Sequence, residues 1–339
     1  MANPKLQTNL PNVEQLNACF ELLTHSEASL LELASVSNAS SSELAPVLRE
    51  LIEQGVLFGS LNPESTIGFS GDVERLSKQS IKQQIAPRYT DILACFALET
   101  VIGSTNDRLL KSPIVAGKAG LCLTEMQVAG RGRRGNAWHS GPFRNIAMSV
   151  AYKFASWPSS TPSFALAAGV AIASVLRDKV NADVKIKWPN DVLVYGKKLG
   201  GILVEAAGAY GGDCLLVVGL GLNVQQRDDS ASAGSDYQWA SLTDLGLDCS
   251  RNDLVAELVS ALIETFILFE SNGFNPFREH WQNLSAFHDA RVLIVNQETS
   301  FEGWQRGVDA SGALIVEDLN GITHTIDDVA TSVRGVNER

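Results

Sequence analysis

Four short apolar segments follow one another closely in the second half of the chain, and their spacing restricts the fold more than any other feature. They occupy residues 184–188, 192–195, 199–205 and 214–220. The breaks between them carry Pro-Asn, Gly-Lys and Gly-Gly, and each is shorter than the roughly dozen residues that a crossover between parallel strands needs. Successive strands are therefore expected to pair antiparallel, which excludes a doubly wound parallel sheet.

Helical and strand patterns continue on both sides of this region. Amphipathic spacing predicts helices over 164–179 and 252–272, the second closed by Gly273. The first sixty residues show three apolar helical faces followed by two short strands, which is typical of a winged helix-turn-helix. The last fifty residues predict only short strands joined by glycine-containing turns, as in a small β-barrel. These strands are expected over 291–295, 303–308, 313–317 and 322–326.

Together the patterns predict an α+β protein with four parts. The parts are a winged helix-turn-helix over 1–72, a polar linker helix over 73–87, a central domain with a mixed or antiparallel sheet over 88–287, and a C-terminal β-barrel over 288–339. The linker is expected to separate two independent apolar cores.

The composition is that of a soluble globular protein, with 339 residues of which 45% are hydrophobic. No apolar run reaches the ~18 residues of a membrane span, and the N-terminus lacks the basic start and apolar stretch of a signal peptide. The five cysteines form no C-x-x-C pair, which favours a reducing cytoplasm over disulfides or a zinc site. We therefore expect a cytoplasmic protein with no metal site of its own and no membrane partner.

A glycine-arginine loop at residues 130–135, which reads Gly-Arg-Gly-Arg-Arg-Gly, carries the strongest functional signal. It lies in a window, 126–177, that contains six Lys or Arg residues and no Asp or Glu, although the whole protein has a net charge of −11. Glycines allow backbone N–H groups to approach a ligand, and guanidinium groups match phosphate or carboxylate oxygens in pairs. The loop therefore predicts an anionic ligand.

Two other interpretations of this loop have to be weighed. It fits G-x-G-x-x-G, but a dinucleotide fold needs an acidic residue about 20 positions later, and residues 151–155 contain none. No G-x-x-x-x-G-K-[ST] occurs in the chain, so ATP would be bound without a P-loop. A solvated basic loop without a ligand is the remaining alternative.

Five motifs that follow one another along the chain favour a ligand-binding role for the loop over these alternatives. They are Gly-Ser-Thr-Asn at 103–106, Gln127 with the glycine-arginine loop, Lys-Trp-Pro-Asn-Asp at 187–191, Lys-Leu-Gly-Gly-Ile-Leu at 198–203, and Gly-Leu-Gly-Leu-Asn at 219–223. Taken together they resemble the biotin protein ligases, and the N-terminal module is similar to that of the bifunctional form that also represses the biotin operon. The resemblance covers essentially the whole chain. It implies a class II synthetase-like central domain and an SH3-like C-terminal barrel.

The resemblance also implies a reaction. Biotin and MgATP would give biotinyl-5′-adenylate with release of pyrophosphate, and biotin would then pass to a lysine of the biotin carboxyl carrier protein of acetyl-CoA carboxylase. The adenylate-bound form would be a homodimer. The lipoate ligases share this adenylate chemistry and are kept as an alternative, although the glycine-arginine loop favours biotin.

Carried over residue by residue, the resemblance predicts three groups in the site. The biotin-binding group is Ser104, Thr105, Asn106, Gln127, Gly130, Arg131, Gly132, Gly201, Gly219 and Gly221. The ATP- and adenylate-binding group is Arg131, Arg133, Arg134, Trp138, Asn190, Asp191 and Asn223, with Trp138 stacking on adenine. The catalytic group is Lys198, Lys187 and Arg133.

Elementary chemistry agrees with this assignment. A ureido ring requires neutral donors and acceptors, which hydroxyl and amide groups supply without the cost of burying a charge. Attack of a carboxylate on a phosphate brings two anions together, so the protein needs only to neutralise and align them. Some residues also have a purely structural reading: Asp191 as a turn former, Trp188 as core, and the glycines as crowded strand positions.

The N-terminal module lacks the basic surface typical of DNA-binding proteins. Residues 1–60 hold Lys5 and Arg49 as their only cations, against seven glutamates. The candidate DNA contacts are Ser40, Ser41, Ser42 and Arg49. Two functions therefore stay open: a ligase that also binds operator DNA as a repressor, and a ligase whose helix-turn-helix no longer binds DNA.

Overall fold

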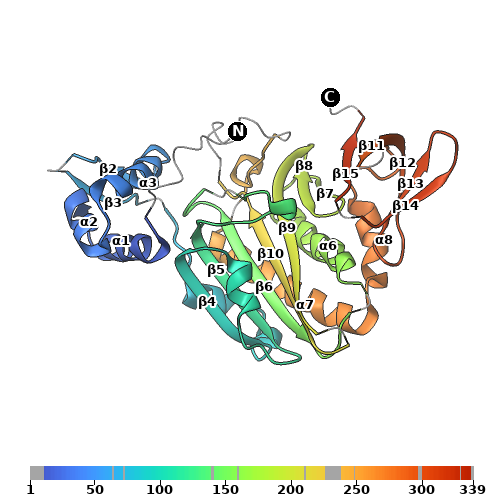
Figure 1. Cartoon of the computed structure of the whole chain (residues 1–339), viewed down its shortest axis with the longest axis horizontal. Helices are drawn as coiled ribbons and strands as arrows, with labels where there is room; N and C mark the ends of the chain where they lie inside the picture. Colours follow the sequence, from blue (N-terminus) through green and yellow to red (C-terminus); the bar gives the residue numbers. More distant parts are fainter. Residues whose placement is uncertain are drawn as a thin grey trace.

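The computed structural model describes residues 11–62, 65–71, 73–138, 141–158, 160–209, 211–225, 238–247, 249–296, 300–328 and 330–336. A small N-terminal module, a central seven-stranded sheet and a C-terminal five-stranded sheet follow one another along the long axis (Figure 1). The combination of helices with mixed and antiparallel sheets confirms the predicted α+β class. None of the described helices is long and apolar enough to cross a membrane.

The N-terminal module consists of three helices and a small sheet. Its elements are α1 (Val13–His25), α2 (Leu30–Ser37), α3 (Ser41–Glu53), and the strands β1 (Ala28–Ser29), β2 (Leu57–Gly59) and β3 (Thr66–Phe69) in the order β1-β3-β2. Asn12, Ser29 and Ser40 each form a capping box at the start of a helix. Such caps satisfy backbone N–H groups that the first turn leaves unpaired, and so they fix where each helix begins.

The central sheet confirms the antiparallel pairing predicted from the short turns. Its order is β4 (Leu93–Ile102), β5 (Ala119–Gln127), β6 (Ile146–Phe154), β10 (Cys214–Leu222), β9 (Lys197–Gly208), β8 (Asp191–Val194) and β7 (Val184–Lys187). Neighbours pair antiparallel except β4 and β5, which are parallel, so the sheet is mixed. Residues 103–118, which include α5 (Thr105–Leu110), make the connection that a parallel pair requires.

The two faces of this sheet have different cover, as β10 illustrates. Leu216, Val218 and Leu220 belong to the main core, together with residues of α6 (Pro162–Lys179) and α7 (Arg251–Asn272). Their neighbours Leu215 and Val217 point the other way and pack with Leu109 of α5. On that second face β10 continues with glycines, which leave the sheet open where the site lies.

The segment predicted as a polar linker is part of the central core. It contains α4 (Lys78–Gln84) and the short η1 (Pro87–Tyr89), and Leu76, Ile81 and Ile85 are buried against the central domain. The helix is shorter than predicted because residues 73–77 run without helix before Ser77 caps α4. The predicted domain boundaries stay predictions.

Two separate apolar cores form, as expected, but the core of the N-terminal module is not independent of the central domain. The core of the N-terminal module includes Val101 and Phe143, which belong to the central part of the chain. The ring of Phe143 lies 5.2 Å from that of Phe20 in an edge-to-face arrangement. The Asn17 side chain also pairs with the backbone N–H and C=O of Val101, both at 2.9 Å. The N-terminal module is therefore packed onto the two segments that lead to the predicted ligand motifs.

The C-terminal part is an antiparallel sheet that follows α8 (Asn275–Leu284) and carries one strand that the sequence patterns did not predict. The order is β14 (Thr323–Ile326), β13 (Leu314–Asp318), β12 (Ser300–Val308), β11 (Arg291–Val295) and β15 (Ser332–Gly335). The last of these, β15, pairs with β11. The indole N–H of Trp188 donates to the carbonyl of Gly312 at 3.2 Å, which joins this sheet to the central domain.

Candidate active site

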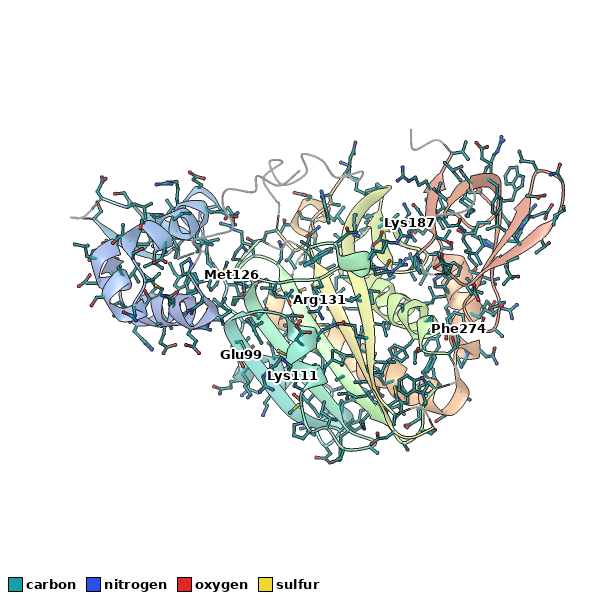
Figure 2. All side chains as sticks on the ribbon, in the orientation of Figure 1. Glu99, Lys111, Met126, Arg131, Lys187 and Phe274 are labelled. Atoms are coloured by element: carbon teal, nitrogen blue, oxygen red, sulfur yellow. The ribbon has the colours of Figure 1, made fainter. Side chains whose placement is uncertain are left out.

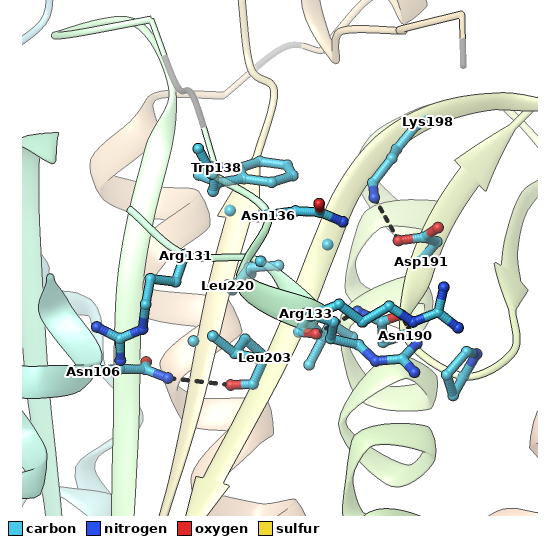
Figure 3. A pocket seen from close by; sticks show the side chains of 18 of the residues that line it. Asn106, Arg131, Arg133, Asn136, Trp138, Asn190, Asp191, Lys198, Leu203 and Leu220 are labelled. Carbon is cyan, nitrogen blue, oxygen red and sulfur yellow. Dashed lines mark hydrogen bonds and ion pairs between the residues drawn. The ribbon is translucent and has the colours of Figure 1, made fainter. Parts of the chain in front are cut away.

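A cavity of about 340 Å³ lies on the open face of the central sheet, beside the glycine-arginine loop. The predicted site residues that line it are Ser104, Thr105, Asn106, Gln127, Arg131, Gly132, Arg133, Arg134, Trp138, Lys187, Asn190, Asp191, Lys198, Gly201, Gly219 and Gly221. Gly130 and Asn223 were predicted as well but are not among the lining residues; Asn223 is buried at the end of β10. Five motifs that lie far apart in the sequence thus meet at one place (Figure 3).

Strand register explains why they meet. Lys187 pairs with Asp191 across β7 and β8, Asp191 pairs with Gly201 across β8 and β9, and Gly201 pairs with Gly221 across β9 and β10. Residues in such a row are neighbours on the sheet, so the motifs at 187–191, 198–203 and 219–223 are aligned by pairing alone. In Figure 2, Lys187 lies toward the C-terminal sheet, and Arg131 lies over the middle of the central sheet.

Two glycines on β10 make room for larger side chains. A Cβ atom at Gly219 would lie 2.5 Å from Oδ1 of Asn106, and one at Gly221 would lie 2.2 Å from the indole ring of Trp138. Real Cβ atoms do not approach other atoms so closely. Asn106 and Trp138 therefore lie directly on the backbone of β10, and the glycines at these two positions are required by close approach.

One end of the cavity is a network of neutral polar groups. The Thr105 N–H and hydroxyl both donate to Oε1 of Gln127, at 3.0 and 3.2 Å. The buried Ser149 hydroxyl lies 2.5 Å from Oδ1 of Asn106 and 2.7 Å from the Thr105 hydroxyl. Since Oε1 of Gln127 accepts from Thr105, the Nε2 group of the same amide is its donor toward other partners. This end of the site can recognise a neutral ring with both donors and acceptors.

Arg131 ties the glycine-arginine loop to this polar end. Its guanidinium donates to both carboxylate oxygens of Asp107, at 2.7 and 2.8 Å, and to Glu205 at 3.1 Å. Nδ2 of Asn106 donates to the same Glu205 carboxylate at 2.6 Å. The hydrogen bonds from Arg131 lower the pKa of Asp107, and those same bonds, first of all to Asp107, raise the pKa of Arg131.

The other end of the cavity is cationic. Nζ of Lys198 lies 2.6 Å from Oδ1 of Asp191, and Lys187 is only 4% exposed with its Nζ 5.6 Å from the centre of the Phe287 ring. Arg133 donates to Oδ1 of Asn190 at 2.9 Å, and Asn190 is itself held by the carbonyl of Ile202 at 2.7 Å. Figure 3 shows Lys198, Asp191, Arg133 and Asn190 opposite Asn106 and Arg131. Several positive groups thus face one region, where they can stabilise an anion.

Two tryptophans line the cavity beside Lys198. The Trp138 and Trp239 rings meet edge to face with centroids 5.9 Å apart, and Nζ of Lys198 lies 5.8 Å from the Trp138 ring centre and 5.9 Å from that of Trp239. Aromatic rings beside an ammonium group offer a surface on which a flat heterocycle can stack.

The sequence patterns missed several residues of this site. Ser149, Glu205 and Asp107 hold the polar end, while Trp239 and residues 331–333 line the cavity. Glu205 could have been found, because it lies two and four residues beyond Leu203 and Gly201 on one strand and so shares their face. Residues 331–333 gave no such signal, since only the packing of the C-terminal sheet brings them here. Trp188, for which a core role was weighed, is both 3% exposed and part of the cavity wall.

The candidate DNA contacts lie in the N-terminal module, away from the cavity. The Ser40 hydroxyl caps α3 and lies 2.6 Å from a carboxylate oxygen of Glu43. Arg49 is exposed on the same helix, with Glu50 exposed beside it. Ser41 and Ser42 occupy the first turn of α3. The structure therefore gives Ser40 a structural role and leaves its contact with DNA a prediction.

Comparisons with known proteins agree with the resemblance found in the motifs. Residues 98–223 match the model of the biotin/lipoate A/B protein ligase family. The chain is 36% identical over 225 residues to the bifunctional ligase/repressor BirA of Salmonella typhimurium, and the match covers 65% of this chain and 69% of that protein. It is 32% identical over 235 residues to the biotin–[acetyl-CoA-carboxylase] ligase of Mycobacterium tuberculosis, and the match covers 65% of this chain and 82% of that protein.

A solved structure shows the same fold. The biotin protein ligase of Aquifex aeolicus in complex with biotin and ATP matches with a TM-score of 0.61 and 21% sequence identity, over 72% of this chain and 100% of that chain. At this identity the match concerns the fold, and the identity and coverage of the two relatives settle the family. The chain belongs to the biotin protein ligase family.

Proposed function

We propose that this protein is an ATP-dependent biotin protein ligase, which makes biotinyl-5′-adenylate and transfers biotin to a lysine of the biotin carboxyl carrier protein of acetyl-CoA carboxylase. The observation that carries the proposal is the division of one cavity into a neutral polar end, at Thr105, Asn106 and Gln127, and a cationic end, at Lys187 and Lys198. Biotin has the same division, since its ureido ring is neutral and its valeryl chain ends in a carboxylate.

In this proposal biotin lies with its ring at the polar end. Hydroxyl and amide groups there match the ureido N–H and C=O groups, and the network through Ser149 fixes which atoms donate. The glycines on β9 and β10 leave the backbone accessible to the bicyclic ring. The biotin-binding group is Ser104, Thr105, Asn106, Gln127, Gly130, Arg131, Gly132, Gly201, Gly219 and Gly221.

The carboxylate of biotin then reaches the cationic end, where ATP binds. The carboxylate oxygen attacks the α-phosphorus, the bond to the β-phosphate oxygen breaks, and pyrophosphate leaves. Lys198, Lys187 and Arg133 neutralise the two anions and hold them in line, which is how a site without a protein nucleophile accelerates this reaction. The proposed nucleotide contacts are Arg131, Arg133, Arg134, Trp138, Asn190, Asp191 and Asn223, with adenine stacked on Trp138.

The second step needs only an amine. The neutral ε-amino group of the carrier lysine attacks the acyl carbon of the adenylate, AMP leaves, and the nitrogen releases a proton to solvent as the amide bond forms. Mg²⁺ enters as part of the MgATP substrate, since Mg²⁺ bound with nucleotides is held largely by phosphate oxygens and water. Within the described residues, no three His, Cys, Asp or Glu side chains cluster closely enough to hold a metal ion.

An exchange assay tests the first step and separates biotin from lipoate. Labelled pyrophosphate is incubated with the full-length protein and MgATP, and label entering ATP is measured with no acid added, with biotin, and with lipoate. The proposal expects exchange only with biotin. Exchange that depends on lipoate, or none with either acid, would contradict it.

The finer features of the fold and of regulation belong to the same proposal. We propose that the N-terminal module is a winged helix-turn-helix, that the C-terminal sheet is an SH3-like barrel, and that the protein works in the cytoplasm. Three capped helices followed by a β2–β3 hairpin support the first assignment.

The adenylate-bound protein would dimerise and repress biotin-synthesis genes from operator DNA, as the name of the Salmonella relative suggests. The second candidate is a ligase with a module that does not bind DNA, which the glutamates of α3 favour.

A further inference from the structure

The glycine-arginine loop forms a small hairpin that is closed on itself. The Gly132 N–H donates to the carbonyl of Asn136 at 2.7 Å, and the Trp138 N–H donates to the carbonyl of Gly130 at 2.9 Å. Cavities of about 340 and 500 Å³ both have this loop in their walls. A backbone hydrogen bond from Ala129 to the carbonyl of Gly103, at 2.9 Å, anchors the base of the loop, and side-chain contacts hold the rest of the hairpin over the site.

Arg131 makes several of these contacts. Its guanidinium joins Asp107 on α5 to Glu205 on β9, two elements that are neighbours only in the folded protein. Glu205 also accepts from Asn106, so this cluster and the polar end of the cavity share one carboxylate. A planar guanidinium with two parallel bonds to one carboxylate is held in orientation as well as in place.

The charges in this cluster argue against a role for the Arg131 side chain as the counter-charge of an anionic ligand. One guanidinium meets two carboxylates, so the cluster carries a net negative charge and offers no excess positive charge to an anionic ligand. The positive groups proposed to face the anion are Lys187, Lys198 and Arg133, at the other end of the cavity. The expectation that the Arg131 side chain serves mainly as a counter-charge therefore fits the geometry less well than a mechanical role.

We propose that Arg131 is a positioning residue that, together with Asp107 and Glu205, latches the hairpin over the polar end of the cavity and slows the escape of bound biotinyl-adenylate. The inference rests on the proposed function. The side chains of Arg131, Asp107 and Glu205 are 36%, 47% and 30% exposed, so solvent weakens the latch. Loss of the latch speeds release of the adenylate by about fivefold, a size typical of a well-oriented pair that is partly exposed.

Release of a chemically prepared, labelled biotinyl-adenylate tests the latch. The labelled compound is bound to the full-length protein, an excess of unlabelled compound is added, and the dissociation rate is measured. The variants are Asp107→Asn, Arg131→Gln and the double variant. The matched control is Arg108→Gln, which alters the next residue of α5, whose contact with Glu99 is longer, at 4.0 Å. Because the compound is supplied, release is measured whether or not a variant can synthesise it.

The latch predicts faster release in both single variants, and no further increase in the double variant, because either change breaks the same contact. Arg108→Gln should release at the wild-type rate. In adenylate synthesis the KM of Asp107→Asn for biotin should rise, because the polar end of the cavity is held less firmly. Simple electrostatics predicts the opposite direction, since removing the Asp107 charge would hold an anionic ligand more tightly.

Three results would overturn the inference. The first is release from Asp107→Asn at or below the wild-type rate. The second is an additive effect in the double variant, which would mean that Arg131 affects release independently of Asp107. The third is failure of the wild-type protein to bind the adenylate, in which case the proposed function fails as well. If the wild-type protein binds the adenylate and Asp107→Asn releases it at the same rate, the proposed function stands and only the latch is excluded.

Discussion

The ammonium group of Lys198 lies 2.6 Å from a carboxylate oxygen of Asp191, and both side chains are largely buried in the cavity wall. The two residues come from different motifs that β8 and β9 bring together. Lys198 is thus fixed at the cationic end, where a reacting carboxylate and phosphate would meet.

We therefore predict that Lys198→Ala slows adenylate formation by about 10²-fold or more without unfolding the protein, because in the proposed mechanism this charge stabilises the transition state. Single-turnover formation of biotinyl-adenylate measures the effect. The control is Lys197→Ala, which removes the exposed neighbouring lysine and should have no effect. A normal rate in folded Lys198→Ala would take Lys198 out of the site.

Arg133 offers a second test at the same end. Its guanidinium donates to Asn190 in the turn between β7 and β8, so the glycine-arginine loop is held at the cationic end as well. Arg133→Ala should raise the release of biotinyl-adenylate by about tenfold to a hundredfold while some synthesis continues, since a charge-assisted contact contributes roughly 1.5–3 kcal/mol. Chromatography of free and bound adenylate during turnover gives the ratio. Retention equal to that of the wild type would show that Arg133 does not hold the intermediate.

The shared core predicts the outcome of removing the N-terminal module. Deletion of residues 1–70 uncovers Val101 and Phe143, so the truncated ligase should be less soluble and should unfold at a lower temperature. Replacing Phe143 by Asn in the truncated protein should recover much of the solubility. Asn is polar and tolerates the positive φ of 61° at this position. Light scattering and thermal unfolding of the two truncated proteins make the comparison. If both truncated proteins are as soluble and as stable to heating as the full chain, the contact between the N-terminal module and Phe143 contributes nothing to stability.

Burial makes a prediction about thiol chemistry. Cys122 lies in the interior of the sheet, and desolvation raises the pKa of its thiol to about 12. The thiolate is the reactive form, so Cys122 should resist alkylation at about pH 8.5 in the native protein and react in urea. The raised pKa also makes folding stability depend on pH. The contribution of this thiol to the free energy of unfolding is fully present below its unfolded pKa of 9.0, and it is lost as the pH rises towards about 12. Mass spectrometry of alkylated peptides checks the first point, and rapid labelling of native Cys122 would contradict it.

The charge of the N-terminal module predicts weak DNA binding with few phosphate contacts. Arg49 is the only Lys or Arg on α3, which also carries Glu43, Glu50 and Glu53. A gel-shift titration against DNA upstream of the host's biotin-synthesis genes, with and without biotin and MgATP at two salt concentrations, measures both affinity and salt dependence. We expect binding only with both ligands and a shallow salt dependence. Tight binding without ligand, or a steep dependence on salt, would contradict this prediction, while no binding at all would favour the ligase-only alternative.

The sequence predicted the architecture best where local chemistry decides it. The short turns predicted the antiparallel strands β7 to β10, and Gly273 predicted the end of α7, because turn length and a glycine cap act over a few residues. The motifs predicted most of the cavity lining for a related reason, since pairing aligns Lys187, Asp191 and Gly201 once the strands form.

Contacts between distant segments could not be predicted in this way. Phe143 occupies a loop, and nothing in its neighbourhood indicates that it completes the core of the N-terminal module. The Arg131 cluster needs Asp107 and Glu205, which belong to an α-helix and a strand that are 98 residues apart in sequence number. Such contacts depend on how the elements pack, and packing was not available from periodicity or motif spacing.

Transfer of biotin to a carrier domain is the decisive assay of ligase activity. The full-length protein is incubated with labelled biotin, MgATP and a purified biotin carboxyl carrier domain, beside a carrier whose acceptor lysine is replaced by arginine. We predict label on the carrier lysine that requires MgATP, is absent from the arginine carrier, and falls by about 10²-fold or more with Lys198→Ala. An unlabelled carrier with the wild-type protein, or labelling that needs no ATP, would contradict the assignment of this protein as a biotin protein ligase.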